Sequence, residues 1–242
     1  MHILLAPSET KTPGGTKGFK LENLSFNELF SARKQAYDEY CKLLKSGDED
    51  AIRKLTGLKK GDLLSIASLD ASMCAISRYT GVAYDYLDYA SLDDSARKYL
   101  QKHLLIFSNL FGIVRACDLL PNYKLKQGEK IGAFDSTKHY KIALKPVLDE
   151  YLSSGDILDL RAEFYDKFYI PSRGYYSLKF LRDDKVLSHM AKAYRGLVLR
   201  HLAQNNCANF NEFLELKIKG LKFKQAQKCG LKTTYIFEVC IN

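Results

Sequence analysis

Short apolar segments of strand length alternate with longer segments of helical periodicity along this chain of 242 residues. Residues 3–5, 157–160 and 235–241 have the apolar composition of short β-strands. Residues 25–44 and 188–203 instead repeat apolar side chains at spacings of three and four, which is typical of amphipathic helices. Because neither periodicity dominates, the sequence predicts an α/β fold (mixed α+β).

Capping residues indicate where the first of these helices begins and ends. Ser25 or Asn27 is predicted to cap the helix over 25–44, since both side chains can accept hydrogen bonds from a first helical turn. Gly47 lies where that helix is expected to end, because glycine favours the left-handed conformation found after a helix.

Three other segments complete the expected organisation. Residues 49–55 predict a second helix, residues 93–107 an amphipathic helix, and residues 110–114 a break into a strand or turn. The chain is 46% hydrophobic and 27% charged, so it can bury a sizeable core. We therefore expect residues 1–242 to form a single compact domain.

Several classes of protein are disfavoured by what the sequence lacks. The first residues carry no basic segment of a signal peptide, and no stretch approaches the ~20 apolar residues of a membrane span, so a cytoplasmic protein is expected. The six cysteines form no C-x-x-C pair and the five histidines no H-x-x-H or H-E-x-x-H spacing, so neither a metal nor a cofactor is predicted. Cys117 is expected to be a buried structural thiol, because Leu119 and Leu120 follow it.

The charge of the chain points to an anionic partner. The formal net charge is +9, and no acidic residue lies between Asp184 and Glu212. Within that interval Lys192, Arg195 and Arg200 share a helix surface by helical spacing, and we call these three residues the cationic face. Alternatively, the cationic face is solvated and paired with acids elsewhere in the fold.

A second basic run follows near the end of the chain. Residues 217–232 include six lysines, and no acidic residue occurs after Glu215 until Glu238. Few aromatic residues accompany them, so contacts with phosphates are expected rather than stacking on bases. Such contacts hold nucleic acid without reading its sequence.

The segment 56–61 resembles the turn of a helix-hairpin-helix motif, with a third helix beginning near Asp62. In that motif a glycine turn and the next helix N-terminus present backbone N–H groups to a phosphate. Lys59 and Lys60 supply positive charge here, but the close Gly-x-Gly spacing of the motif is absent. An ordinary linker is the alternative.

Two further segments collect polar residues. Ser8, Glu9, Thr10 and Lys11 follow the first predicted strand, without the residue order of a Walker A loop. Alternatively, this segment is a polar turn in which hydroxyls cap local backbone groups. Arg115 and Asp118 either pair with each other, three residues apart, or help to bind an anion.

Taken together, five separated blocks resemble the YaaA family of bacterial proteins linked to peroxide resistance. They are residues 3–12; 78–87; 108–115 with Asp118, Leu119 and Tyr123; 159–162 with Tyr165; and 188–192 with Arg195, Gly196 and Arg200. Ala162 stands where the family often has a serine. The resemblance implies a single α/β domain with a positively charged cleft, DNA binding that includes a helix-hairpin-helix element, and a role in limiting peroxide damage linked to intracellular iron.

The predicted function is binding of duplex or distorted DNA with low sequence specificity. The predicted DNA or anion contacts are Lys11, Lys59, Lys60, Arg115, Arg161, Lys192, Arg195 and Arg200. The predicted pocket residues are Ser8, Glu9, Thr10, Tyr84, Asp118, Tyr123 and Asp159.

Two alternatives come from other classes of protein. If these acids, cations and hydroxyls converge, they resemble an enzyme pocket for a phosphorylated or nucleotide substrate, with Glu9 or Asp159 as the base. The other alternative is a purely structural or partner-binding protein.

Overall fold

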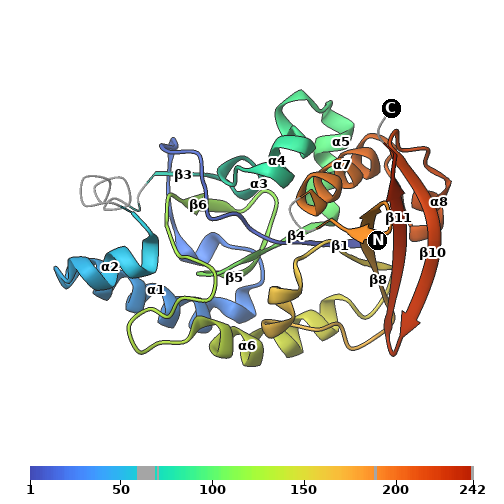
Figure 1. Cartoon of the computed structure of the whole chain (residues 1–242). Coiled ribbons are helices and arrows are strands. Elements are labelled where there is room, and N and C mark those ends of the chain that lie inside the picture. Colours follow the sequence, from blue (N-terminus) through green and yellow to red (C-terminus); the bar gives the residue numbers. More distant parts are fainter. Residues whose placement is uncertain (59–68, 70, 188–189, 241–242) are drawn as a thin grey trace.

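A twisted, mostly parallel sheet runs through the centre of the molecule (Figure 1). The structure is a computed structural model that describes residues 1–58, 69, 71–187 and 190–240. The strand order is β10-β11-β8-β7-β1-β4-β5, and β9 pairs with β8. The strands are β1 (His2–Leu5), β4 (Leu104–Ser108), β5 (Gly112–Arg115), β7 (Ile157–Asp159), β8 (Tyr175–Arg182), β9 (Lys185–Val186), β10 (Leu221–Cys229) and β11 (Lys232–Val239).

Strand β1 occupies the middle of this sheet and pairs in parallel with a neighbour on each side. Ile3 lies opposite Leu104 of β4 and opposite Leu158 of β7. The chain passes from β1 to β4 on one side and later returns to β7 on the other, so the strand order reverses beside β1. In open α/β sheets, ligands bind outside the carboxyl ends of the strands at such a reversal.

Helices cover both faces of the sheet. In Figure 1, α1 and α6 lie on one side, and α4, α5 and α7 lie on the other. The helices are α1 (Phe30–Lys45), α2 (Glu49–Thr56), α3 (Ala75–Arg78), α4 (Val82–Leu87), α5 (Asp94–His103), α6 (Ser136–Tyr151), α7 (Ala191–Gln204) and α8 (Phe210–Glu215), with 3-10 turns η1 (Leu21–Asn23), η2 (Asn27–Leu29), η4 (Tyr89–Ser91) and η5 (Glu163–Lys167). A small sheet joins β2 (Lys17–Gly18), β3 (Ala71–Cys74) and β6 (Leu119–Pro121). The predicted mixed α/β architecture is confirmed.

Helices α4 and α7 approach each other unusually closely. Gly196 of α7 faces the backbone of Ala83 in α4, where a Cβ on Gly196 would lie only 2.0 Å from the Ala83 carbonyl oxygen. Any side chain would therefore push the two helices apart. The close contact places the first turns of α4 and α7 side by side.

Two buried arginines, Arg33 and Arg78, donate to backbone carbonyl oxygens, and within the described residues neither has a carboxylate at hydrogen-bonding distance. The Arg33 guanidinium donates to the carbonyl oxygens of Ser25, Phe26, Phe111 and Ile113, and so ties α1 to the β4–β5 turn. Arg78 donates in the same way to the carbonyls of Leu120, Thr12 and Ala71. Each guanidinium satisfies backbone groups that would otherwise be buried without partners.

The predicted helix over 93–107 is too long. Helix α5 ends at His103, and residues 104–108 form β4 at the centre of the sheet. Leu104 and Phe107 fit a helical spacing, but the continuous run Leu-Leu-Ile-Phe is buried on both faces, as expected of a central parallel strand. Sheet pairing therefore overrides the local helical periodicity.

The predicted start of the first helix also differs from the structure. Asn27 opens the 3-10 turn η2, and no side chain caps α1. Ser25 instead donates its hydroxyl to Asp118 at 2.6 Å, across 93 residues of sequence. The helix ends at Lys45, just before Gly47, as predicted.

Candidate functional site

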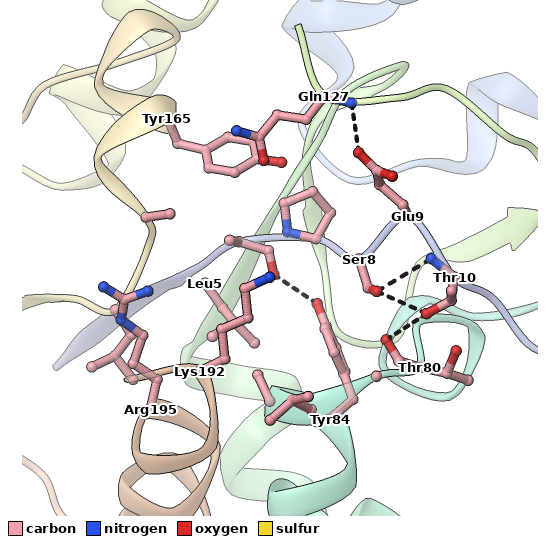
Figure 2. Close-up of a pocket in the computed structure, with 17 residues that line it drawn as sticks. Leu5, Ser8, Glu9, Thr10, Thr80, Tyr84, Gln127, Tyr165, Lys192 and Arg195 are labelled. Carbon is pink, nitrogen blue, oxygen red and sulfur yellow. Dashed lines mark hydrogen bonds between the residues drawn. The ribbon is translucent and has the colours of Figure 1, made fainter. Parts of the chain in front are cut away.

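A pocket of about 330 Å³ lies at the carboxyl ends of β1 and β7, beside the reversal in strand order. Figure 2 shows the side chains that converge there. They come from the segment after β1, the start of α4, the segment after β7, the first turns of α7, and Gln127. The lining residues are Leu5, Ala6, Pro7, Ser8, Glu9, Thr10, Thr80, Gly81, Val82, Ala83, Tyr84, Gln127, Leu160, Ala162, Tyr165, Lys192 and Arg195.

Two cations from the start of α7 form one side of this pocket. Lys192 and Arg195 lie three residues apart and therefore project from the same helix face. Within the described part of the chain, neither side chain makes a hydrogen bond or an ion pair. Burial lowers the pKa of Arg195, and the charges of Asp159 and Glu163 oppose that shift, so the guanidinium stays protonated. Two cations without a contacting acid favour an anionic ligand.

At another part of the pocket, two hydroxyl groups of the segment after β1 meet the backbone that precedes α4. Thr10 Oγ1 donates to the Thr80 carbonyl oxygen at 3.2 Å and lies 3.1 Å from Ser8 Oγ, which must therefore be the donor in that second bond. Gly81 has a φ of 99°, and a Cβ there would lie 3.2 Å from both hydroxyl oxygens. Glycine thus provides both the backbone conformation and the space that these hydroxyls need.

Among the described residues that line this pocket, Glu9 is the only one with a carboxylate. Its Oε1 accepts a hydrogen bond from the backbone N–H of Gln127 at 3.0 Å. Glu9 and Arg195 lie on opposite sides of the pocket (Figure 2). A ligand bound by the cations would therefore extend toward a carboxylate that can accept a proton.

Tyr84 and Tyr165 supply aromatic walls. The Tyr84 hydroxyl donates to the Ala6 carbonyl oxygen at 2.9 Å, and the Tyr165 hydroxyl donates to Asn109 Oδ1 at 3.1 Å. Burial raises the pKa of both phenols well above the ordinary value, so both are neutral at physiological pH. Their rings shape the pocket, while their hydroxyls hold its framework.

Lys11 supports the Ser8 segment but does not line the pocket. Its ammonium group donates to the Ser8 carbonyl oxygen at 3.1 Å and lies 4.1 Å from the ring centroid of Tyr123. Desolvation, reinforced by the charge of Lys124, lowers the pKa of Lys11 to about 7. The predicted pocket residue Tyr123 is itself buried outside this lining, and its hydroxyl bonds with Tyr79 and Ser108.

Asp159 and Arg161 form a buried ion pair rather than two separate site residues. Arg161 Nη2 donates to Asp159 Oδ2 at 2.6 Å, and Nε donates to Oδ1 at 2.8 Å. Although burial opposes ionisation, the guanidinium lowers the pKa of Asp159 and the carboxylate raises the pKa of Arg161. The structure does not bring either residue into the 330 Å³ pocket.

The cationic face predicted on α7 is not a common surface. Arg200 donates to the carbonyl oxygens of Leu87 and Asp88 at the end of α4, and its Nη1 lies 3.5 Å from Asp88 Oδ2. The alternative, pairing with acids elsewhere in the fold, is thus correct for Arg200. Lys192 and Arg195, nearer the start of α7, line the pocket instead.

Arg115 and Asp118 lie elsewhere and do not pair through their side chains. The Arg115 guanidinium stacks over the rings of Phe26 and Tyr151. Asp118 accepts hydrogen bonds from the backbone N–H of Arg115 and from Ser25. Lys59 and Lys60, with the helix expected from Asp62, fall outside the described residues.

The predicted burial of Cys117 is wrong. Its thiol is exposed, because it lies in the turn between β5 and β6 rather than in a strand. Partial desolvation and the Asp118 carboxylate nevertheless raise the pKa of this thiol. Its low reactivity stays a prediction.

Among the lining residues that were not predicted as site residues are Gln127, Thr80 and Gly81. Gln127 gives no sequence signal, since it belongs to an irregular segment that only the fold brings to Glu9. Thr80 and Gly81 could have been found from the Thr-Gly pair that precedes a helix. In the described part of the chain, no three His, Cys, Asp or Glu side chains gather as a metal site would require, and no helix is long and apolar enough to span a bilayer.

Comparisons with known proteins give the family. Residues 1–227 match the family model described as peroxide stress protein YaaA. An uncharacterized protein of Campylobacter jejuni is 43% identical over 99% of each chain. UPF0246 proteins of Streptomyces coelicolor and Corynebacterium efficiens are 34% and 35% identical, and the matches cover 86% and 84% of this chain and 85% of each relative. The chain therefore belongs to the YaaA family of peroxide stress proteins.

Proposed function

We propose that the 330 Å³ pocket binds a phosphorylated small molecule of nucleotide size, and that Glu9 acts on it as a general base. The observation that carries this proposal is the pair Lys192 and Arg195, which face the pocket without a contacting acid from the described part of the chain. A phosphate group would supply the missing negative charge.

The dimensions of the pocket favour a small ligand over a DNA duplex. Ligand pockets in proteins typically have volumes of ~300–1,000 Å³. The pocket here, at about 330 Å³, lies at the small end of that range. It has room for a nucleoside phosphate or part of a larger nucleotide, whereas a duplex needs an open groove.

Different polar groups of the pocket would bind the phosphate and transfer the proton. Lys192 and Arg195 would bind and orient the phosphate, while Glu9, on the opposite side, would accept a proton from a ligand hydroxyl or from water. Ser8 is a poor candidate for a nucleophile, because its proton is donated to Thr10 Oγ1. The proposal is therefore general-base catalysis without a covalent serine intermediate.

A thermal-shift screen of nucleoside and sugar phosphates tests this proposal. At least one phosphorylated compound is expected to raise the Tm of the parent protein, while its dephosphorylated form has no such effect. Arg195→Met should abolish the shift, and Lys222→Met, which removes an exposed lysine on β10, should preserve it. If every phosphorylated compound leaves Tm unchanged at millimolar concentration, the proposal is wrong.

Glu9→Gln separates catalysis from binding. The substitution preserves an oxygen that can accept the hydrogen bond from Gln127 but removes the basic carboxylate. With any ligand that the parent protein converts, we expect this variant to retain binding and lose turnover by about 10²-fold or more. Unchanged turnover would assign the proton transfer to another group.

DNA binding with low sequence specificity is the second candidate, and the basic hairpin β10–β11 favours it. Lys222 and Lys228 are exposed on β10, whereas Lys224 is neutralised by Asp184 and Glu238. Each phosphate contacted contributes about 0.9 to the slope of log affinity against log salt. Fluorescence anisotropy with duplex DNA should therefore show a slope that flattens by about two units in a Lys222→Ala, Lys228→Ala variant. Absence of binding at ~50 mM salt would dismiss this candidate.

Both candidates are compatible with a role in peroxide stress, which we propose from the family description. A strain lacking the gene is expected to survive hydrogen peroxide poorly. The parent gene should restore survival, whereas the Arg195→Met gene should not if the pocket carries the function. Equal rescue by both genes would separate the pocket from the stress role.

A further inference from the structure

A second cavity, of about 270 Å³, adjoins the first and shares one residue with it, Arg195. Its walls come from β8, β11, the segment after β7 and the start of α7. The lining residues are Asp159, Arg161, Glu163, Asp166, Ser177, Leu178, Lys179, Phe180, Val186, Leu187, Ala191, Arg195, Gln227, Lys232 and Thr234.

The segment 159–163 forms the partition between the two cavities. Its side chains alternate, as in extended backbone: Leu160 and Ala162 line the first cavity, and Asp159, Arg161 and Glu163 line the second. Arg195 lines both cavities, so its guanidinium lies at their junction. A phosphate bound by Arg195 would have one cavity on each side.

The two cavities suit different chemical groups. The first has aliphatic walls and two tyrosine rings, which suit a planar, partly apolar group such as a nucleobase. The second offers hydroxyls and an amide from Ser177, Thr234 and Gln227. Hydroxyls and amides, which both donate and accept hydrogen bonds, suit a polyhydroxylated group.

Charge in the second cavity is nearly balanced, which argues against a strongly charged occupant. Asp159 and Arg161 neutralise each other at 2.6 Å, and Asp166 lies 3.5 Å from the same guanidinium. The two positive charges of Lys179 and Lys232 equal in number the two negative charges of Glu163 and Asp166. A neutral sugar therefore fits this cavity better than a further phosphate group.

We propose that the ligand is a two-part molecule: a nucleoside diphosphate whose second phosphate carries a sugar. The base and its ribose occupy the first cavity, the diphosphate lies against Arg195 and Lys192, and the terminal sugar occupies the second cavity. This inference rests on the proposed function, because it requires a phosphate at Arg195, but it adds a subsite and a substrate class.

Calorimetric titration with three probes tests the inference. The probes are adenosine 5′-monophosphate, adenosine diphosphate and adenosine diphosphate ribose, which extend stepwise from the first cavity toward the second. The diphosphate ribose is expected to bind at least tenfold more tightly than the monophosphate and more tightly than the diphosphate. Thr234→Val, which removes one hydroxyl from the second cavity, should weaken only the diphosphate ribose, by about fivefold.

Thr233→Val is the matched control, because Thr233 neighbours Thr234 on β11 but does not line either cavity. It should leave all three affinities unchanged. If diphosphate and diphosphate ribose bind equally, and Thr234→Val affects neither, the sugar subsite is refuted while the phosphate pocket stands. If none of the three probes binds although another phosphorylated compound raises Tm, the subsite is refuted and the phosphate pocket stands. If no phosphorylated compound raises Tm, the proposed function fails and the subsite with it. An equal loss of all three affinities in Thr234→Val would also refute a sugar-specific role.

Discussion

Lys11 has a structural role in the fold that its charge alone does not predict. It was predicted as an anion contact, but the structure places its ammonium group against the Ser8 carbonyl oxygen and the Tyr123 ring. Burying a cation among aromatic rings costs free energy unless the group loses its proton. Lys11 therefore couples the position of the Ser8 segment to pH.

The stability contributed by Lys11 should depend on pH in a defined direction. Its pKa is about 7 in the folded protein, whereas an unfolded lysine has a pKa of ~10.4. Between these values the unfolded chain binds more protons, so the contribution to stability rises with pH, by up to ~1.4 kcal/mol per pH unit, and is flat below 7.

Urea unfolding of the parent and Lys11→Met at pH 6.5 to 9.5 measures this contribution. The free energy of unfolding of the parent minus that of the variant should increase from pH 7 upward. Groups common to both proteins cancel in the difference. A difference that is flat with pH would contradict the buried, deprotonated lysine.

At the scale of elements, the sequence predicted some strands and helices, such as β1 and α1, missed others, such as β8 and α6, and did not predict which segments meet. The strand over 3–5 and the helix before Gly47 were identified because their periodicity and turn residues are local. Helix α5 was extended through Leu104 because the pairing of β4 with β1 is a long-range interaction. Likewise, Lys192 and Arg195 were identified from their charge. The ion pairs of Arg161 and Arg200 could not be predicted, because the fold places their partners.

Gly196 is the position at which the packing of α7 against α4 should be most sensitive. In an ordinary helix interior, Gly→Ala stabilises by ~1 kcal/mol. Here the new Cβ would lie 2.0 Å from the Ala83 carbonyl oxygen. We therefore expect Gly196→Ala to lower the free energy of unfolding by ~1–3 kcal/mol and to weaken ligand binding, since the shifted helix carries Lys192 and Arg195.

Thermal and urea unfolding measure this effect. Gly18→Ala is the control, because a Cβ at Gly18 has no atom within 4 Å and its φ is not in the left-handed range. The control should change stability little. A Gly196→Ala protein as stable as the parent would show that α4 and α7 are not held at this separation.

At the scale of the whole molecule, the pocket depends on segments spread along almost the entire chain. Ser8 and Arg195 line the same cavity although they are far apart in sequence. The single-domain expectation therefore predicts that the pocket and the core unfold together. Circular dichroism and tyrosine fluorescence, in a chain that has no tryptophan, should report coincident urea transitions. Two separated transitions, or two protease-resistant fragments, would refute one folding unit.

Lys192 and Arg195 are proposed to recognise a phosphate in the pocket at the ends of β1 and β7. A thermodynamic cycle of two proteins and two ligands measures this recognition most directly. The parent and Arg195→Met are each titrated with adenosine 5′-monophosphate and with adenosine. The parent should prefer the phosphorylated ligand by tenfold or more, and Arg195→Met should lose most of that preference while its affinity for adenosine is unchanged. An equal preference for the phosphorylated ligand in both proteins would place the phosphate elsewhere and contradict the account.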